Sequence, residues 1–216
     1  MRAEVDLVVP VKTLDRAKSR LVGAADHGAG NPVAHAALAL ALALDTIAAA
    51  CRTDGVRHVL VVTSDPAVTS ELRVMGVESV QEPATGGLNP ALRHGAAMLR
   101  QRDPLAAIGA LQADLPALRP AELSAAIAQV RGRRAFCADR QGTGTTLLVA
   151  APGTGLRPRF GSDSAAAHAA SDAVELTGSW PSLRCDVDTA DDLSLACALG
   201  LGSRTAALLD TACARP

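Results

Sequence analysis

Short apolar segments alternate with longer segments of helical composition along the first two thirds of the chain. Four short segments rich in β-branched and apolar residues are predicted strands: 5–11, 58–63, 77–80 and 105–111. Four segments rich in helix formers, three of them beginning with proline, are predicted helices: 33–50, 66–75, 90–100 and 120–130. The alternation predicts an α/β fold with a mostly parallel, Rossmann-like three-layer sheet, whose ligands lie at the carboxyl ends of the strands.

The pattern is less regular in the last third of the chain. Three further strands are predicted at 135–138, 145–150 and 183–187. Thr189 is the expected N-cap of the helix that follows, and Ser203 is the expected N-cap of the last helix. No repeat or linker marks a boundary, so we expect one domain over residues 1–216, in which 134–180 could form a subdomain or lid.

The longest apolar stretch, 33–50, approaches the length that crosses a membrane. His35, Asp45 and Thr46 interrupt it, and ionisable groups are costly in lipid, so we expect a buried helix and no membrane partner. The first residues lack the apolar core of a secretory signal, and the five cysteines contain no C-x-x-C pair, so reduced thiols are expected. These features predict a cytoplasmic protein.

The net charge and the aromatic content argue against a nucleic-acid partner. The net charge is -1, and the aromatic residues are Phe136, Phe160 and Trp180. Nucleic-acid-binding surfaces need positive charge, and single-strand binders also need aromatic rings on which bases stack. We therefore expect no nucleic-acid partner, while the sequence does not decide between a monomer and a homo-oligomer.

The first predicted strand runs into a basic segment that contains Lys12, Arg16, Lys18 and Arg20. At the carboxyl end of a parallel strand, such cations could neutralise a triphosphate together with backbone N–H groups. A solvated basic loop would have the same composition. The sequence contains no Walker A and no G-x-G-x-x-G pattern, which argues against a P-loop NTPase and a Rossmann dehydrogenase.

Carboxylates follow two of the predicted strands. Asp114 comes just after 105–111, and Asp186 and Asp188 lie at the end of 183–187. Carboxylate oxygens from separate strand ends suit Mg²⁺ that is shared with substrate phosphates. Each aspartate could instead cap an adjacent turn or helix, so both interpretations stay open at this point.

Two later segments are rich in glycine and hydroxyl groups, G-T-G-T at 142–145 and R-F-G-S-D-S at 159–164. Glycine allows the backbone to approach an anion, and Ser and Thr donate hydrogen bonds to phosphate or carboxylate oxygens. Taken alone, the first segment could be a simple turn. The five histidines do not pair at metal-binding spacings, so each of them, His168 included, is expected on the surface or in the core.

The order of these motifs resembles that of a known enzyme family. The segments are V-P-V-K at 9–12, A-K-S-R-L at 17–21, L-N at 88–89, Q-A-D-L-P at 112–116, D-R-Q-G-T-G-T at 139–145, R-F-G-S-D-S at 159–164 and C-D-V-D-T at 185–189. Over nearly the whole chain they resemble the phosphoenolpyruvate and 2-phospho-L-lactate guanylyltransferases of coenzyme F420 biosynthesis. Two positions depart from the family pattern, because Ala113 stands where glycine is usual and Ser162 where proline is usual.

The resemblance implies a single nucleotidyltransferase domain of the GT-A-like type that uses GTP, phosphoenolpyruvate and Mg²⁺, with 134–180 binding the acceptor. It implies that the residues acting in catalysis at the GTP phosphates are Lys12, Lys18, Arg20 and Asp114. The residues implied to contact the nucleotide are Pro10, Lys12 and Asn89. Asp114 and Asp186 would bind the metal, with Asp188 as a second candidate. The residues implied to bind phosphoenolpyruvate are Thr145, Gly161 and Ser164.

The implied reaction needs no general base, which agrees with the lack of a Ser-His-Asp pattern in the sequence. The attacking phosphate oxygen is already an anion, so no general base is needed, and no Ser-His-Asp pattern is present. The acceptor could instead be 2-phospho-L-lactate or 3-phospho-D-glycerate. More distant alternatives are a GT-A glycosyltransferase that uses Asp186-Val187-Asp188 as a D-x-D motif, and a non-catalytic nucleotide-binding protein.

Overall fold

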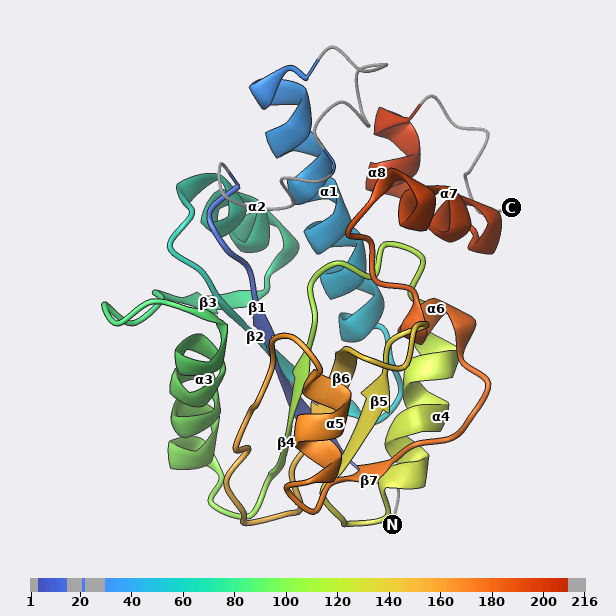
Figure 1. Ribbon diagram of the computed structural model, residues 1–216. Coiled ribbons are helices and arrows are strands. Elements are labelled where there is room, and N and C mark those ends of the chain that lie inside the picture. Colours follow the sequence, from blue (N-terminus) through green and yellow to red (C-terminus); the bar gives the residue numbers. More distant parts are fainter. Residues whose placement is uncertain (1–3, 15–20, 22–29, 210–216) are drawn as a thin grey trace.

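Strands from both halves of the chain form one seven-stranded sheet in the computed structural model, which describes residues 4–14, 21 and 30–209. The order of the strands is β3-β2-β1-β4-β6-β5-β7 (Figure 1). The strands are β1 (Val5–Pro10), β2 (Val56–Val62), β3 (Glu78–Val80), β4 (Ala107–Leu111), β5 (Ala135–Ala138), β6 (Thr145–Val149) and β7 (Val174–Glu175). The helices are α1 (Pro32–Cys51), α2 (Pro66–Met75), α3 (Leu88–Arg102), α4 (Pro120–Val130), α5 (Ser164–Ala169), α6 (Pro181–Arg184), α7 (Ala190–Leu199) and α8 (Ser203–Leu208).

Parallel pairing dominates this sheet. β1 pairs in parallel with β2 and β4, β3 with β2, and β7 with β5. β6 is the exception, because it runs antiparallel to both of its neighbours, β4 and β5. The predicted α/β fold with a mostly parallel sheet is therefore confirmed, and the reversal of β6 is the detail that the pattern of residues did not show.

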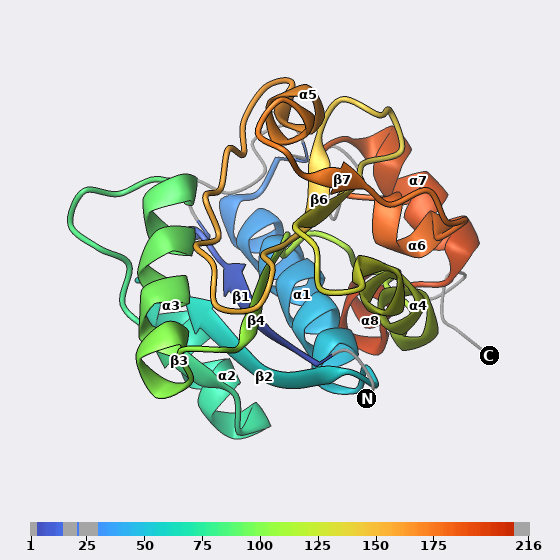
Figure 2. The same cartoon turned by 90° about the horizontal axis from the view of Figure 1, so that it is seen from below.

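Helices cover both faces of the sheet and make three layers (Figure 2). One core cluster contains apolar side chains of α1, α2 and α4, and the other contains those of α3 and α5. Successive residues of β1 enter different clusters, because Leu7 and Val9 belong to the first cluster and Val8 belongs to the second. This alternation is the two-residue period of a strand, and it explains why a strand covered on both faces is a continuous apolar run.

The long apolar helix expected from the sequence is α1. By length and composition it could cross a membrane, but 67% of its apolar window is buried inside the fold. Asp45 on this helix is buried and accepts a hydrogen bond of 2.8 Å from the N–H of Thr205 in α8. Thr46 is also buried, and its Oγ1 accepts a 2.9 Å hydrogen bond from the N–H of Leu115. The polar residues that interrupt α1 therefore attach it to α8 and to the loop after β4.

One predicted strand and one predicted cap are wrong. Residues 183–187 do not form a strand, because α6 begins at Pro181 and the chain after it has no regular structure until α7. Proline supplies the φ that the first turn of a helix needs, which outweighs the apolar pattern here. The N-cap of α8 is Gly202 rather than Ser203, whereas Thr189 caps α7 through a capping box, as predicted.

The cysteines follow the expectation in part. Cys51, Cys137 and Cys185 are free thiols. Burial raises the pKa of Cys137 and of Cys185 to about 11, so both are unreactive core residues at neutral pH. Cys197 is disulfide-bonded, so the expectation of reduced cysteines is wrong for this residue.

Candidate active site

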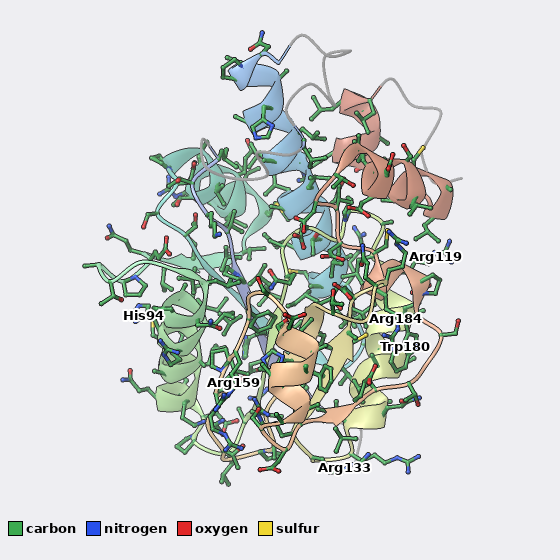
Figure 3. The ribbon with its side chains drawn as sticks, in the orientation of Figure 1. His94, Arg119, Arg133, Arg159, Trp180 and Arg184 are labelled. Carbon is green, nitrogen blue, oxygen red and sulfur yellow. The ribbon has the colours of Figure 1, made fainter. Side chains whose placement is uncertain are left out.

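A cleft of about 690 Å³ opens at the carboxyl ends of β1 and β4. Segments from distant parts of the sequence line it, together with one side of α1. The predicted site residues among its lining are Pro10, Lys12, Asp114, Thr145, Gly161, Ser164, Asp186 and Asp188. Of the three aromatic residues, Phe160 also lines the cleft, whereas Trp180 belongs to the core cluster under α4 and α6 (Figure 3).

Of the other predicted residues, Asn89 is described and is not part of this lining. Lys18 and Arg20 lie outside the described residues. Asn89 at the start of α3 donates from Nδ2 to the carbonyl oxygen of Phe160 at 2.8 Å and accepts the Phe160 N–H at Oδ1 at 2.9 Å. Asn89 therefore holds the segment around Phe160 against α3, and its implied contact with the nucleotide stays a prediction.

The reversal of β6 places Thr145 in the cleft. Thr145 is the first residue of β6, and Leu147, two residues later, pairs with Leu111 at the end of β4. Because the two strands are antiparallel, the start of β6 lies beside the end of β4. A parallel β6 would have put Thr145 at the opposite edge of the sheet. The segment 134–180 thus reaches the cleft through this reversal.

A buried carboxylate shapes the turn before β6. Asp139 accepts hydrogen bonds from the N–H of Thr143 at 2.9 Å and from the N–H of Gly144 at 2.7 Å. A Cβ at position 144 would lie 2.3 Å from Oδ2 of Asp139, so the turn needs a glycine there. Gly144 therefore has a structural role in the turn, which is one of the two interpretations that the sequence left open. Thr145 beside it lines the cleft.

The loop that carries Lys12 is held by an aspartate from another strand end. Lys12 is exposed on the cleft just after β1. The buried carboxylate of Asp65 accepts the N–H of Leu14 at 2.9 Å and also accepts the N–H of Ala67, at the start of α2, at 2.8 Å. Asp65 is not among the residues predicted from the sequence, although an aspartate directly before Pro66 is a helix N-cap signal.

Asp114 and Asp186 lie close together because their loops are hydrogen-bonded. The N–H of Val187 donates to the carbonyl oxygen of Asp114 at 3.0 Å. Burial raises the pKa of Asp186 well above its usual range, and the carboxylates of Asp114, Asp188 and Asp139 raise it further. The structure therefore brings the two predicted acidic segments together in the cleft, although the strand from which the second was predicted does not form.

These carboxylates have the donor chemistry of a magnesium site. Mg²⁺ prefers oxygen ligands and is usually bound by one or two carboxylates together with substrate phosphates. Within the described ranges, no group of three His, Cys, Asp or Glu side chains is placed to hold a metal ion by itself. Asp114 and Asp186 thus fit a metal that also takes substrate oxygens, and a cation would relieve the repulsion that raises the pKa of Asp186.

A histidine that sequence analysis assigned only to the surface or the core lies behind Thr145. His168 in α5 is 0% exposed, and its Nδ1 lies 2.9 Å from Oγ1 of Thr145. Ser164 also contacts this oxygen, at 3.2 Å. Burial lowers the pKa of His168 to about 4, and the charges of Arg134 and Arg159 contribute to the shift. The spacing of Ser164 and His168, four residues apart on one helix, was the available signal.

Known families and structures agree with this arrangement. The family model described as "Guanylyl transferase CofC like" matches residues 5–210. The chain belongs to this family of guanylyl transferases. A phosphoenolpyruvate guanylyltransferase of Salinispora arenicola is 54% identical over 209 residues, which cover 95% of this chain and 94% of that protein. The protein of the same name from Geodermatophilus obscurus is 53% identical over 211 residues, which cover 97% and 95%. The predicted resemblance and the prediction of an enzyme are confirmed.

Solved structures of two other transferases share the fold of this guanylyl transferase. A Desulfovibrio desulfuricans protein described as a nucleotide-diphospho-sugar transferase has a TM-score of 0.68 at 16% identity, over 96% of this chain and 94% of that one. A 4-diphosphocytidyl-2C-methyl-D-erythritol synthase has a TM-score of 0.58 at 13% identity, over 92% and 99%. At such identities the likeness shows the fold alone, and it confirms the GT-A-like type.

Proposed function

We propose that this guanylyl transferase joins GTP to phosphoenolpyruvate in coenzyme F420 biosynthesis, giving enolpyruvyl-2-diphospho-5'-guanosine and pyrophosphate. The observation that carries the proposal is one cleft that holds Lys12, the carboxylates of Asp114 and Asp186, and the hydroxyl groups of Thr145 and Ser164. These are the groups needed to bring two anions together. Relatives named for the same reaction, at 53% and 54% identity over nearly the whole chain, support the proposal.

In this reaction an oxygen of the acceptor phosphate attacks the α-phosphorus of GTP in line. A new phosphorus–oxygen bond forms there, and the bond from the α-phosphorus to the oxygen that bridges it to the β-phosphate breaks. Pyrophosphate leaves with the electron pair. The nucleophile is already an anion, so no side chain has to remove a proton, and the protein's contribution is alignment and charge compensation.

Positive charge at the nucleotide comes from the loop after β1. Lys12 lies at the rim of the cleft, where its ammonium group can compensate the charge of the triphosphate. Lys18 and Arg20 are proposed to add to it. Pro10 lines the same cleft and is proposed to contact the nucleotide.

Carboxylates that line the cleft are proposed to hold the metal. Asp114 and Asp186 are the proposed ligands of Mg²⁺, with Asp188 as the second candidate on the same loop. When bound there, Mg²⁺ would stabilise the charge of the departing pyrophosphate. In the same cleft, the hydroxyls of Thr145 and Ser164 are proposed to donate hydrogen bonds to the acceptor, and the backbone at Gly161 is proposed to approach it closely.

The direct test is a panel of substrates. Each of GTP, ATP, CTP and UTP is combined with phosphoenolpyruvate, 2-phospho-L-lactate or 3-phospho-D-glycerate, and both pyrophosphate and the product mass are measured. We expect turnover with GTP, fastest with phosphoenolpyruvate. Preference for another acid or another base would contradict the proposed substrates. Pyrophosphate from none of the twelve pairs, with nucleoside diphosphate released from a nucleotide-sugar, would favour the glycosyltransferase alternative.

A cytoplasmic location and the absence of nucleic-acid and membrane partners belong to the same proposal. The burial of α1 inside the fold supports the absence of a membrane partner. The near-neutral net charge of -1 supports the absence of a nucleic-acid partner. Cell fractionation that finds the protein in the membrane pellet would contradict this part of the proposal.

A further inference from the structure

His168 occupies a closed position directly behind the hydroxyl groups of the cleft. Its ring is 0% exposed and packs edge-on against Phe160, with ring centroids 5.1 Å apart. Its Nε2 lies 3.0 Å from the backbone nitrogen of Arg159, and its Nδ1 lies 2.9 Å from Oγ1 of Thr145. The ring therefore joins three parts of the site: α5, the segment around Phe160 and the first residue of β6.

The two hydrogen bonds of the ring determine where its proton lies. A backbone N–H can only donate, so Nε2 must accept from Arg159 and carries no proton. In a neutral imidazole the proton is then on Nδ1, which donates it to Oγ1 of Thr145. Burial favours the neutral ring and lowers the pKa of His168 to about 4, with Arg134 and Arg159 adding to the shift. The ring is thus neutral, with its proton on Nδ1, across the physiological range of pH.

The proton on Nδ1 of His168 then determines whether the hydroxyl of Thr145 can donate a hydrogen bond to a ligand or accept one. Oγ1 of Thr145 accepts from Nδ1 of His168 and from the hydroxyl of Ser164, 3.2 Å away. Both lone pairs of this oxygen are occupied in this arrangement, so the hydroxyl can only donate, and Thr145 lines the cleft. If the bond to Ser164 ran the other way, the free proton would belong to Ser164, which lines the same cleft. In both cases one O–H remains as a donor.

We propose that His168 is a positioning residue, which orients the hydroxyls of Thr145 and Ser164 as hydrogen-bond donors toward an anionic oxygen of the acceptor. This inference rests on the proposed function for the identity of the acceptor. A donor that is fixed before binding favours phosphate or carboxylate oxygens over neutral groups that would themselves need an acceptor. His168 touches no substrate, so its replacement should act on acceptor binding and leave nucleotide binding unchanged.

Two replacements separate this role from simple packing. In His168→Asn the side-chain NH₂ can take the place of Nδ1–H and donate to Thr145, while the bond from Arg159 is lost. In His168→Gln the side-chain oxygen can take the place of Nε2 and accept from Arg159, while the donor to Thr145 is lost. A purely structural role predicts similar damage from both replacements, and equal effects on the two substrates.

Steady-state kinetics with GTP and phosphoenolpyruvate test the difference. We expect His168→Gln to raise the KM for phosphoenolpyruvate about tenfold or more, the weight of one hydrogen bond to a charged group, with an unchanged KM for GTP. His168→Asn should raise the same KM less than His168→Gln does. Equal effects of the two replacements, or a parallel change in the KM for GTP, would overturn the proposal.

A spectroscopic measurement tests the proton arrangement without turnover. In the ¹⁵N-labelled protein, long-range ¹H–¹⁵N correlations distinguish a protonated Nδ1 from a protonated Nε2, and His168→Asn identifies the signals of His168. The neutral ring with its proton on Nδ1 is expected at pH 7. A proton on Nε2, or a doubly protonated ring, would overturn the inference. A missing turnover of the wild-type protein would instead contradict the proposed function and leave this result standing.

Discussion

Lowering the pH should destabilise the folded protein through His168 at pH values at which the ring is still neutral in the folded state. The ring is 0% exposed, and burial, followed by the charges of Arg134 and Arg159, lowers its pKa from 6.5 to about 4. As the pH falls below 6.5, the unfolded chain takes up a proton at this position while the folded chain does not, so stability is lost between pH 6.5 and about 4. At pH 5, about 1.5 units below the ordinary pKa, the loss from this group is about 2 kcal/mol.

Urea unfolding at pH 7 and at pH 5 measures this loss. The single tryptophan, Trp180, is 6% exposed, so its fluorescence reports unfolding. Carboxylates titrate in the same range, and comparison with His168→Asn and His168→Gln removes their contribution. Between the two pH values the wild-type protein should lose about 2 kcal/mol more than either variant. Equal losses in the three proteins would refute the reasoning, because the folded-state pKa of His168 would then be close to its ordinary value.

Three further replacements test the site and its supports. Asp114→Asn should abolish pyrophosphate release with little change in the urea midpoint, and substantial turnover in Mg²⁺ would remove Asp114 from the proposed metal site. Thr46→Val should lower the free energy of unfolding by about 1–3 kcal/mol, because a buried N–H in the loop after β4 loses its acceptor; an unchanged urea midpoint would contradict this. Gly144→Ala should impair turnover, because its Cβ would lie 2.3 Å from Oδ2 of Asp139. Gly155→Ala is the control: the nearest atom to a Cβ at that position is 3.8 Å away, so this variant should resemble the wild type.

The sequence predicted which residues line the cleft better than it predicted the hydrogen bonds that hold those residues in place. Asp114 follows an apolar strand and was recognisable from residue type and position, whereas Thr145 was implied by the resemblance to a family. Asp65, Thr46 and His168 were not recognised, because their partners are 51, 69 and 23 residues away in the sequence. A local pattern shows that a polar residue interrupts an apolar run, but it does not show which distant group the residue will bind.

The errors in the fold have a similar origin. The apolar residues of 183–187 fit a buried strand and a buried helical turn equally well, and Pro181 decides for the helix. The direction of β6 depends on which strands become its neighbours, which is a property of the whole sheet. The placement of Thr145 in the cleft was therefore implied by the resemblance to a family, while its physical cause became visible only in the structure.

Two polar residues of α1, Asp45 and Thr46, also bear on the order in which a newly made chain forms its cleft. α1 leaves the ribosome early, whereas the partners of Thr46 and Asp45 follow 69 and 160 residues later. The loop of Asp114 also depends on residues made late, because its other side is held by the N–H groups of Val187 and Gly202. Contacts between such distant positions form late in folding. A nascent chain that has not yet produced residues 202–205 therefore lacks hydrogen bonds that hold α1 and the loop after β4, both of which line the cleft, so we expect activity only after this last segment docks.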